Sequence, residues 1–294
     1  MKKILQIGTR GQVGWELLRT CAPLGEVVAL DYPEVDLSDF AGLRRLVQEV
    51  KPNIILNAAA YTNVDKAESE PEKARAINAI GPGVLAEEAK KIDAVLVHYS
   101  TDYIFDGTKG SPYVETDTPN PLSVYGWTKL EGEQAIAGSG CVNLVLRTSW
   151  VYSMRQGGFV TKVMQWARAQ EVMRVVDDQI SSPTSARILA EVTALILAQG
   201  RDDVVGYLGE KGGLYHCAGG GSCSRYEWAK AILELDPHKE EQVVKELLPV
   251  RSDDFAVPAN RPMVSVLNGS KILNLAIRLE CWQESLAALM DSKY

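Results

Sequence analysis

The architecture of this 294-residue chain is set near its start by Lys3-Ile4-Leu5-Gln6-Ile7-Gly8-Thr9-Arg10-Gly11-Gln12-Val13-Gly14. The first five of these residues are a short, mostly apolar run that predicts a buried strand, and a helical pattern over Gln12–Cys21 follows at once. The glycines between and within these two elements have GxxGxxG spacing. Such a turn at a helix N-terminus favours binding of a pyrophosphate, because glycine lets the backbone approach closely and the helix terminus attracts negative charge.

Short apolar runs continue to alternate with helical patterns up to about residue 150. The predicted strands are Lys3–Ile7, Glu26–Leu30, Asn53–Leu56, Ala94–Tyr99 and Val142–Leu146, and the predicted helices are Gln12–Cys21, Phe40–Val50, Glu72–Ile92 and Val124–Ile136. The helix over Glu72–Ile92 is expected to break at Gly81-Pro82-Gly83. Runs such as Ile54-Ile55-Leu56 are apolar on both faces, as in a sheet covered by helices on both sides. The sequence therefore predicts an α/β fold with a Rossmann-type, doubly wound parallel sheet.

The second half of the chain is less regular. It contains a strand pattern at Val172–Val176, a helical pattern at Ile188–Leu197 and several glycine-rich loops. We predict a dinucleotide-binding domain over residues 1–150, to whose sheet the strand near 172–176 returns. Residues 151–294 are predicted to form mainly a smaller C-terminal α/β lobe that binds the substrate.

Composition excludes several classes of protein. The chain has 31 Lys and Arg against 38 Asp and Glu, and the net charge of −7 argues against a nucleic-acid polymer or an anionic membrane as partner. Its 5 cysteines are scattered, which fits a reducing cytoplasm better than a disulfide framework. No run of about 18 apolar residues occurs, so no transmembrane helix is expected. These features indicate a cytoplasmic protein.

A tyrosine followed four residues later by a lysine occurs three times, beginning at Tyr125, Tyr207 and Tyr226. Tyr207 lies in a stretch broken by glycines, which is not predicted to be helical. Tyr226 has no hydroxyl residue 23–25 positions upstream. Only Tyr125 combines a predicted helix with Ser100 and Thr101 at the end of a predicted parallel strand, where ligands gather. Context therefore selects Tyr125.

The spacing of Tyr125 and Lys129 has a chemical reason. Positions i and i+4 share a helix face, so the ammonium of Lys129 can approach the phenol of Tyr125. A nearby cation is expected to lower the phenol's pKa from about 10 towards working pH. The hydroxyl of Thr101 can then bond a reacting carbonyl oxygen, which makes these three residues candidates for acid–base catalysis.

Together these residues resemble the extended branch of the short-chain dehydrogenase/reductase superfamily, and within it the dTDP-4-dehydrorhamnose reductase family. The segments that carry this resemblance are Asn57–Thr62, Val64–Glu68, Tyr99–Gly107, Asn120–Gly126, Arg147–Tyr152, Asp178-Gln179, Pro183-Thr184 and Arg261-Pro262. The resemblance implies an NAD(P)H-dependent oxidoreductase of dTDP-rhamnose biosynthesis. Its reaction is reduction of the C4 ketone of dTDP-6-deoxy-L-lyxo-4-hexulose (dTDP-4-dehydro-L-rhamnose) to dTDP-L-rhamnose.

The resemblance also implies roles for individual residues. Tyr125 would be the proton donor, Lys129 its activator and a nicotinamide-ribose ligand, and Thr101 the partner of the carbonyl. The implied cofactor-binding residues are Gly8, Arg10, Gly11, Gln12, Val13, Gly14, Asp31, Asp36, Leu37, Ala60, Tyr61, Thr62, Tyr125 and Lys129. The implied substrate-binding residues are Thr101, Asp102, Tyr125 and Trp150.

Charge near the glycine turn bears on the choice of cofactor. Asp31 ends the second predicted strand, where a carboxylate can bind the adenosine ribose and would repel a 2′-phosphate. Arg10, within the turn, would attract that phosphate. Because these effects oppose each other, use of both NADPH and NADH is predicted.

The chain departs from the family's pattern at two positions in the predicted lobe. Ser181 stands where a glycine is usual, and Arg225 where a tryptophan is often found. Some members bind a metal at a dimer contact through acidic residues, and Glu16 fits one such position. Arg187, however, stands where a second carboxylate would be expected, so no metal is predicted. The resemblance is compatible with a homodimer.

Two alternatives stay open at this point. A sugar-nucleotide dehydratase or epimerase would share the fold and cofactor, and a non-catalytic regulatory subunit, like the β subunit of methionine adenosyltransferase, would share the fold alone. Dehydratases typically carry Asp-Glu after the threonine, whereas this chain reads Thr101-Asp102-Tyr103. The intact set of Tyr125, Lys129 and Thr101 favours the reductase over a regulatory subunit.

Overall fold

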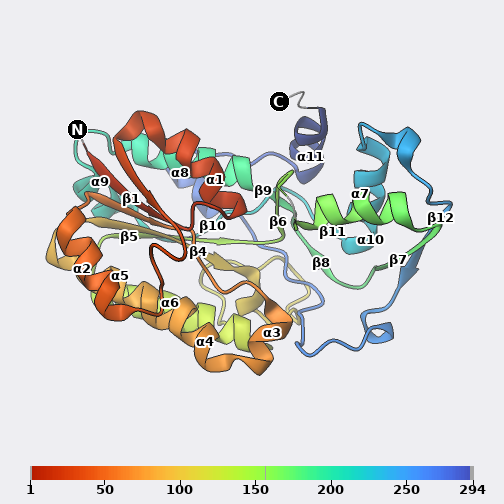
Figure 1. Cartoon of the computed structure of the whole chain (residues 1–294), viewed down its shortest axis with the longest axis horizontal. Coiled ribbons are helices and arrows are strands. Elements are labelled where there is room, and N and C mark those ends of the chain that lie inside the picture. The colour runs from red at the N-terminus through yellow and green to blue at the C-terminus, as the bar shows by residue number, and fades with distance from the viewer. Residues whose placement is uncertain (1, 156, 292–294) are drawn as a thin grey trace.

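The computed structural model describes residues 2–155 and 157–291, and its centre is a six-stranded sheet (Figure 1). The strand order is β10-β5-β4-β3-β1-β2, and every neighbouring pair is parallel. The strands are β1 (Lys3–Ile7), β2 (Glu26–Leu30), β3 (Ile54–Asn57), β4 (Val95–Thr101), β5 (Asn143–Thr148) and β10 (Gly213–His216). The predicted α/β fold with a parallel sheet is confirmed.

Helices cover both faces of this sheet (Figure 1). One face carries α1 (Gln12–Cys21), α8 (Ala186–Gln199) and α9 (Val204–Lys211), and the other carries α2 (Phe40–Val50), α5 (Gly81–Lys91) and α6 (Val124–Ser139). Successive strand residues alternate between the two cores. Ile54 packs in the cluster that contains Leu17, whereas Ile55 packs with Leu43 and Ile136. This alternation explains why the run is apolar on both faces.

The helical region before β4 differs from its prediction. The chain passes from α3 (Val64–Ser69) and α4 (Pro71–Arg75) through a π-helical turn at Ala76–Ile80 into α5, without a break at the glycines. Gly81 is helical, and its N–H bonds the carbonyl of Ala76 five residues earlier. Pro82 lacks an N–H, and its ring crowds the carbonyl four residues before it, so the helix widens locally instead of ending.

The prediction that the strand near 172–176 returns to the main sheet is wrong. β7 (Val172–Val176) pairs with β12 (Glu246–Val250) in a separate two-stranded sheet, and β10 is the sixth strand of the main sheet. In β7, Met173 is buried between the exposed Val172 and Arg174. A strand covered on one face only suits a lobe edge and not the centre of a doubly wound sheet.

The smaller lobe lies at one end of the molecule (Figure 1). It comprises β6 (Val151–Tyr152), α7 (Phe159–Ala169), β7, β8 (Ile180–Ser181), β9 (Thr184–Ser185), β11 (Cys223–Ser224), α10 (Arg225–Leu235), β12 and α11 (Trp282–Asp291). Its core is centred on the fully buried Trp228. The second half of the chain therefore contributes both to this lobe and, through α8, α9 and β10, to the main domain.

The expectation that Tyr207 lies outside a helix is also wrong, because α9 contains it. Asp203 caps this helix by accepting a hydrogen bond from the backbone of Gly206 at 2.9 Å, and Leu208 packs in the main core. Capping and burial outweigh the low helix propensity of glycine. The hydroxyl of Tyr207 donates to Gln199 at 2.8 Å, so its own contact is structural.

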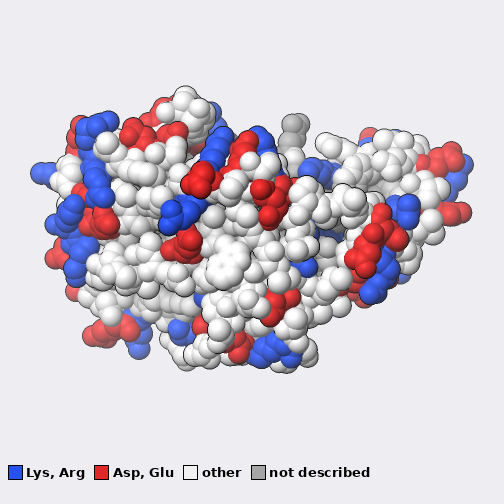
Figure 2. All heavy atoms as spheres, turned by 90° about the horizontal axis from the view of Figure 1, so that it is seen from below, with Lys and Arg blue, Asp and Glu red and all other residues white. Residues whose placement is uncertain are grey.

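The cysteines, the helices and the surface charges can be compared with what the composition predicts. All five cysteines are free. Within residues 2–155 and 157–291, no helix is both long and apolar enough to cross a membrane. On the face drawn in Figure 2, cationic and anionic side chains lie interspersed.

Candidate active site

The glycine turn fits tightly between β1, α1 and the segment after β3. Gly8 has φ +89°, and a Cβ there would lie 2.5 Å from the backbone nitrogen of Ala59. A Cβ on Gly14 would lie 1.8 Å from the carbonyl oxygen of Gly8. Gly11 is the N-cap of α1 and supplies no side-chain cap, so the first N–H groups of this helix are left for an anion. These residues fit the pyrophosphate of a dinucleotide.

Asp31 holds this turn in place. Its carboxylate accepts hydrogen bonds from the backbone nitrogens of Arg10 at 2.6 Å and Tyr32 at 2.7 Å. The guanidinium of Arg10 donates to the carbonyl of Tyr32 at 3.0 Å and lies 3.6 Å from Glu34. The structure thus brings Arg10 and Asp31 together at the carboxyl ends of β1 and β2.

The other predicted cofactor residues have distinct contacts. Gln12 donates to the carbonyl of Val151 at 3.2 Å, which ties the glycine turn to the smaller lobe. Tyr61 donates its hydroxyl to Glu70 at 2.8 Å, and its neighbours Ala60 and Thr62 complete the segment after β3. The remaining members are Val13, which packs against the main core, Asp36, which accepts from Ser38, and Leu37, which is buried in the second core.

Tyr125 and Thr101 lie together at the carboxyl end of β4. Ser123 caps α6 by accepting from Gly126 at 3.2 Å, and a Cβ on Gly126 would lie 2.3 Å from the carbonyl of Tyr103. This close approach sets Tyr125 beside Thr101, close enough for the Thr101 hydroxyl to act on the phenol. Burial raises the pKa of Tyr125, against the opposing effect of the Thr101 hydroxyl. The expected lowering of the pKa of this phenol is therefore wrong for this structure.

Lys129 is fully buried, with 1% of its surface exposed. Its Nζ donates to the carbonyl of Tyr99 at 2.6 Å and lies 3.0 Å from Nε2 of His98. Burial lowers the pKa of Lys129 to about 8. The polar contacts of its amine go to β4, whereas the sequence suggested an approach to the phenol of Tyr125.

Two of the four predicted substrate residues, Asp102 and Trp150, lie next to the two departures from the family's pattern. Asp102 accepts hydrogen bonds from Ser181 at 3.0 Å and from Ser265 at 2.5 Å, and burial raises its pKa to about 6. Trp150 has φ +42°, and the guanidinium of Arg225 lies 3.6 Å from the centre of its indole ring. Ser181 therefore contacts Asp102 and Arg225 contacts Trp150. The spacing of these residues in the sequence did not predict either contact.

A cavity of about 390 Å³ opens beside Arg225 in the smaller lobe. It is lined by Phe159, Trp166, Gln170, Met173, Arg174, Val175, Val176, Gln179, Arg225, Ser252, Phe255, Val257 and Arg261. Three of these residues are arginines and none is an aspartate or glutamate, although Arg261 pairs with Asp65 at 2.6 Å and Arg174 lies 3.9 Å from Asp254. Arginine and aromatic side chains together suit an anion with an aromatic part.

Tyr103 connects this cavity with the catalytic group. Its hydroxyl lies near the guanidinium groups of both Arg225 and Arg261. Its ring packs edge to face against that of Tyr125, with 6.0 Å between the ring centroids. Sequence reasoning did not place Tyr103, Arg225 or Arg261 in the site. For Arg261, the Arg261-Pro262 motif of the family resemblance could have indicated a place in the site.

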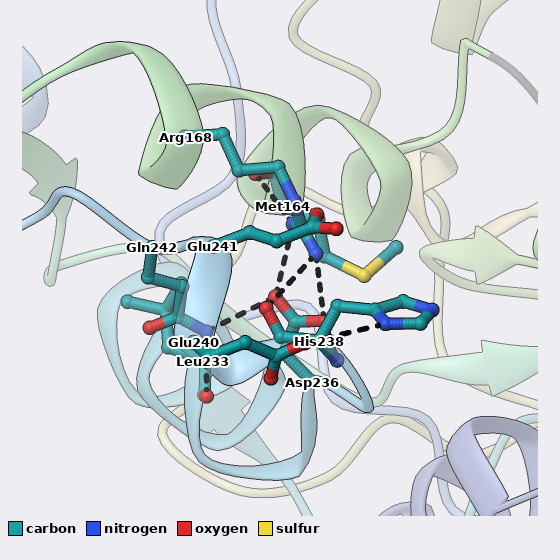
Figure 3. Close-up of polar contacts among 8 residues, drawn as sticks. All are labelled: Met164, Arg168, Leu233, Asp236, His238, Glu240, Glu241 and Gln242. Atoms are coloured by element: carbon teal, nitrogen blue, oxygen red, sulfur yellow. Dashed lines mark hydrogen bonds and ion pairs between the residues drawn. The ribbon is translucent and has the colours of Figure 1, made fainter.

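Two groups of charged residues bear on metal binding. Arg19 bridges Glu16 at 3.4 Å and Glu191 at 3.5 Å, so these carboxylates are already paired. In the smaller lobe, the ligand atoms of His238, Glu240 and Glu241 lie within 4.8 Å of one another, and all three residues are exposed. Figure 3 shows Arg168 pairing with Asp236 and Glu241 beside them. This cluster is a surface ion-pair network and carries no metal assignment.

The glycine turn and the tyrosine–lysine helix, on this sheet, define a nicotinamide-dependent oxidoreductase of the short-chain dehydrogenase type. A family model described as "RmlD substrate binding domain" matches residues 1–294. The dTDP-4-dehydrorhamnose reductase of Burkholderia thailandensis is 41% identical, over 96% of this chain and 95% of that protein. The chain belongs to the dTDP-4-dehydrorhamnose reductase family, as its motifs predicted.

Two solved structures agree closely with this fold. A dTDP-4-dehydrorhamnose reductase from Clostridium acetobutylicum has a TM-score of 0.88 and 34% identity, with 98% of each chain covered. The dTDP-4-dehydrorhamnose reductase from Bacillus anthracis, solved in complex with NADP, has a TM-score of 0.87 and 31% identity, again with 98% of each chain covered.

Proposed function

We propose that this chain catalyses the NAD(P)H-dependent reduction of the C4 ketone of dTDP-4-dehydro-L-rhamnose to dTDP-L-rhamnose. The observation that carries the proposal is that the hydroxyls of Thr101 and Tyr125 lie together at the carboxyl end of β4. The names of the relatives support the choice of substrate. The test is incubation of the purified protein with the keto sugar and NADPH, followed by NMR identification of dTDP-L-rhamnose as product.

The residues of the main domain fit a dinucleotide. The turn from Gly8 to Gly14 would hold the pyrophosphate, Asp31 the adenosine ribose, and Lys129 the nicotinamide ribose. When bound, the nicotinamide cofactor supplies the hydride for the reaction. Residues 1–150, together with α8, α9 and β10, would therefore form the cofactor domain, and the rest of the chain the substrate lobe.

The chain's own catalytic step is a proton transfer from Tyr125. The raised pKa keeps its phenol protonated at neutral pH, as a proton donor requires. Thr101 would hydrogen-bond the ketone oxygen, and the proton of the Tyr125 hydroxyl would pass to that oxygen as it becomes an alcohol. The phenolate left behind would then regain a proton from solvent.

The arginine-lined cavity would take the nucleotide end of the substrate. Arginine pairs well with phosphate oxygens, and Arg225 and Arg261 both contact Tyr103 next to the catalytic phenol. Aromatic side chains such as Phe159 and Phe255 would cover the apolar faces of a base. This arrangement would leave the sugar between the cavity and Tyr125, near Asp102 and Trp150.

The dehydratase alternative is disfavoured by Tyr103. A dehydratase needs an additional acid–base pair, and Tyr103 stands where such enzymes have a glutamate. Burial raises the pKa of Tyr103, which leaves still less of its phenolate available as a base at neutral pH. Ketone reduction needs only one proton donor, so the structure favours the reductase over the dehydratase.

Replacing Arg10 by alanine is expected to weaken NADPH binding more than NADH binding. A charge-assisted contact with the 2′-phosphate contributes about 1.5–3 kcal/mol, which is roughly a 10- to 150-fold change in affinity. Titration of both cofactors into wild-type and Arg10→Ala protein measures this difference. An equal loss for both cofactors would show that Arg10 does not contact the phosphate.

A further inference from the structure

Three buried polar side chains meet behind the catalytic helix. Asn57 on β3 and His98 on β4 are partners in the register of the parallel strands, and Lys129 reaches them from α6. Each of the three has 1% of its surface exposed. Nδ1 of His98 lies 3.1 Å from Nδ2 of Asn57, and Nε2 lies 3.0 Å from Nζ of Lys129.

The backbone fixes the direction of these contacts. The N–H of Ala59, which can only donate, bonds Oδ1 of Asn57 at 3.3 Å. The amide group of Asn57 therefore turns its NH₂ towards His98, and Nδ1 of the histidine must accept. Burial lowers the pKa of His98 well below its usual value, so the ring is neutral and its one proton lies on Nε2.

A donor on Nε2 matters for Lys129. The ammonium form of lysine has three donors and no lone pair, so it cannot accept a hydrogen bond from His98, whereas the neutral amine can. We propose that Asn57 and His98 are positioning residues that favour the neutral amine of Lys129 and thereby set the pH at which this lysine loses its proton. The inference rests on the proposed role of Lys129 in the reductase.

Other charged groups near Lys129 act in both directions. Glu133, one turn further along α6, raises the pKa of Lys129, but it is itself paired with the buried Arg147 at 2.7 Å. Tyr125 lies one turn earlier on α6. The carbonyl of Tyr99 accepts from the amine in either protonation state. The pKa of Lys129 lies at about 8, so the ammonium is lost as the pH rises through that value.

The sharpest test is Asn57→Asp, which keeps the shape of the side chain. A carboxylate has no donor, so one oxygen would still accept from Ala59 while the other could only accept from His98. The proton of the imidazole would move to Nδ1, and Nε2 would become an acceptor for the ammonium of Lys129. The substitution thus reverses the direction of the contact without removing any partner.

Nitrogen NMR of the full chain reads this change directly, because the sequence has only 3 histidines. His216 is an internal reference, since its Nδ1 lies 3.0 Å from the carbonyl of Tyr113 and must carry its proton. His238 is exposed, unlike the two buried histidines. A His98→Gln variant identifies the His98 signals by their loss. The wild type should show the proton of His98 on Nε2, opposite to His216, and Asn57→Asp should convert His98 to the His216 pattern.

The second readout is the pH profile of turnover. If the ammonium of Lys129 is needed, wild-type activity should fall above about pH 8. In Asn57→Asp this fall should move up by at least about one pH unit, a tenfold change in proton affinity. The negative charge of the new aspartate would itself raise the pKa of Lys129 and so cause part of this shift. The pH profile of turnover is therefore interpreted together with the nitrogen NMR spectrum, which reports the position of the His98 proton.

Two results would overturn the inference: a wild-type spectrum with the proton of His98 on Nδ1, or a converted spectrum with an unmoved pH profile. The spectrum needs no turnover. An inactive wild type with the expected spectrum would therefore contradict the proposed function alone.

Discussion

Tyr125→Phe should reduce turnover by about 10²–10⁴-fold, because it removes the proposed proton donor while it retains the ring. The rings of Tyr125 and Tyr103 pack edge to face with 6.0 Å between their centroids, and phenylalanine preserves this packing. The unfolding temperature should therefore stay close to that of the wild type. Steady-state kinetics with the keto sugar, alongside thermal denaturation, measure both quantities.

Tyr226→Phe is the matched control. Tyr226 also precedes a lysine by four residues on a helix, but its hydroxyl donates to the carbonyl of Leu247, at 3.4 Å in the smaller lobe. Its loss should leave turnover nearly unchanged. Equal losses in the two variants would contradict the assignment of Tyr125.

Gly14→Ala should disrupt the cofactor site and destabilise the fold together. The new Cβ would lie 1.8 Å from the backbone oxygen of Gly8, and backbone on both sides leaves no flexible group to move aside. Overpacking of this kind costs about 1–3 kcal/mol and occasionally more. Denaturant unfolding should show a loss at the upper end of that range, and NAD(P)H binding should become undetectable in the same preparation.

Gly11→Ala separates the two effects. Gly11 has φ −70°, and its nearest neighbour to an added Cβ is the oxygen of Gly8 at 3.6 Å, an ordinary contact. Stability should change by less than about 1 kcal/mol. Cofactor affinity should still fall, because the methyl group would stand where the pyrophosphate approaches the helix terminus. Unchanged affinity would place the pyrophosphate elsewhere.

Much of the fold could be predicted from sequence because its strands are local patterns. Runs such as Ile54–Leu56 must be covered on both sides, and the turn from Gly8 to Gly14 fixes the first crossover. The sheet to which a later strand belongs is not local. β7 and β10 are both short strands, and their packing partners, distant in sequence, assign one to the lobe and the other to the main sheet.

The candidate site also divides into features that local sequence predicts and features that depend on packing between distant segments. Tyr125, Lys129 and Thr101 could be predicted because their spacing on one helix and one strand carries chemical meaning. The pKa of Tyr125 could not, because it depends on burial contributed by several elements. Ser181 and His98 were missed as neighbours of Asp102 and Lys129, since β8, β4 and α6 meet only in the folded chain.

The central claim is that this chain reduces a keto sugar nucleotide and releases the oxidised cofactor. The most direct measurement is the stoichiometry of NAD(P)H oxidation, followed by absorbance, against product quantified by NMR, with dTDP-4-dehydro-L-rhamnose as substrate. The account predicts one NAD(P)H consumed for each dTDP-L-rhamnose formed and no reaction with dTDP-glucose. Conversion of dTDP-glucose to a 4-keto-6-deoxy sugar without net oxidation of the cofactor would contradict it and would indicate a dehydratase.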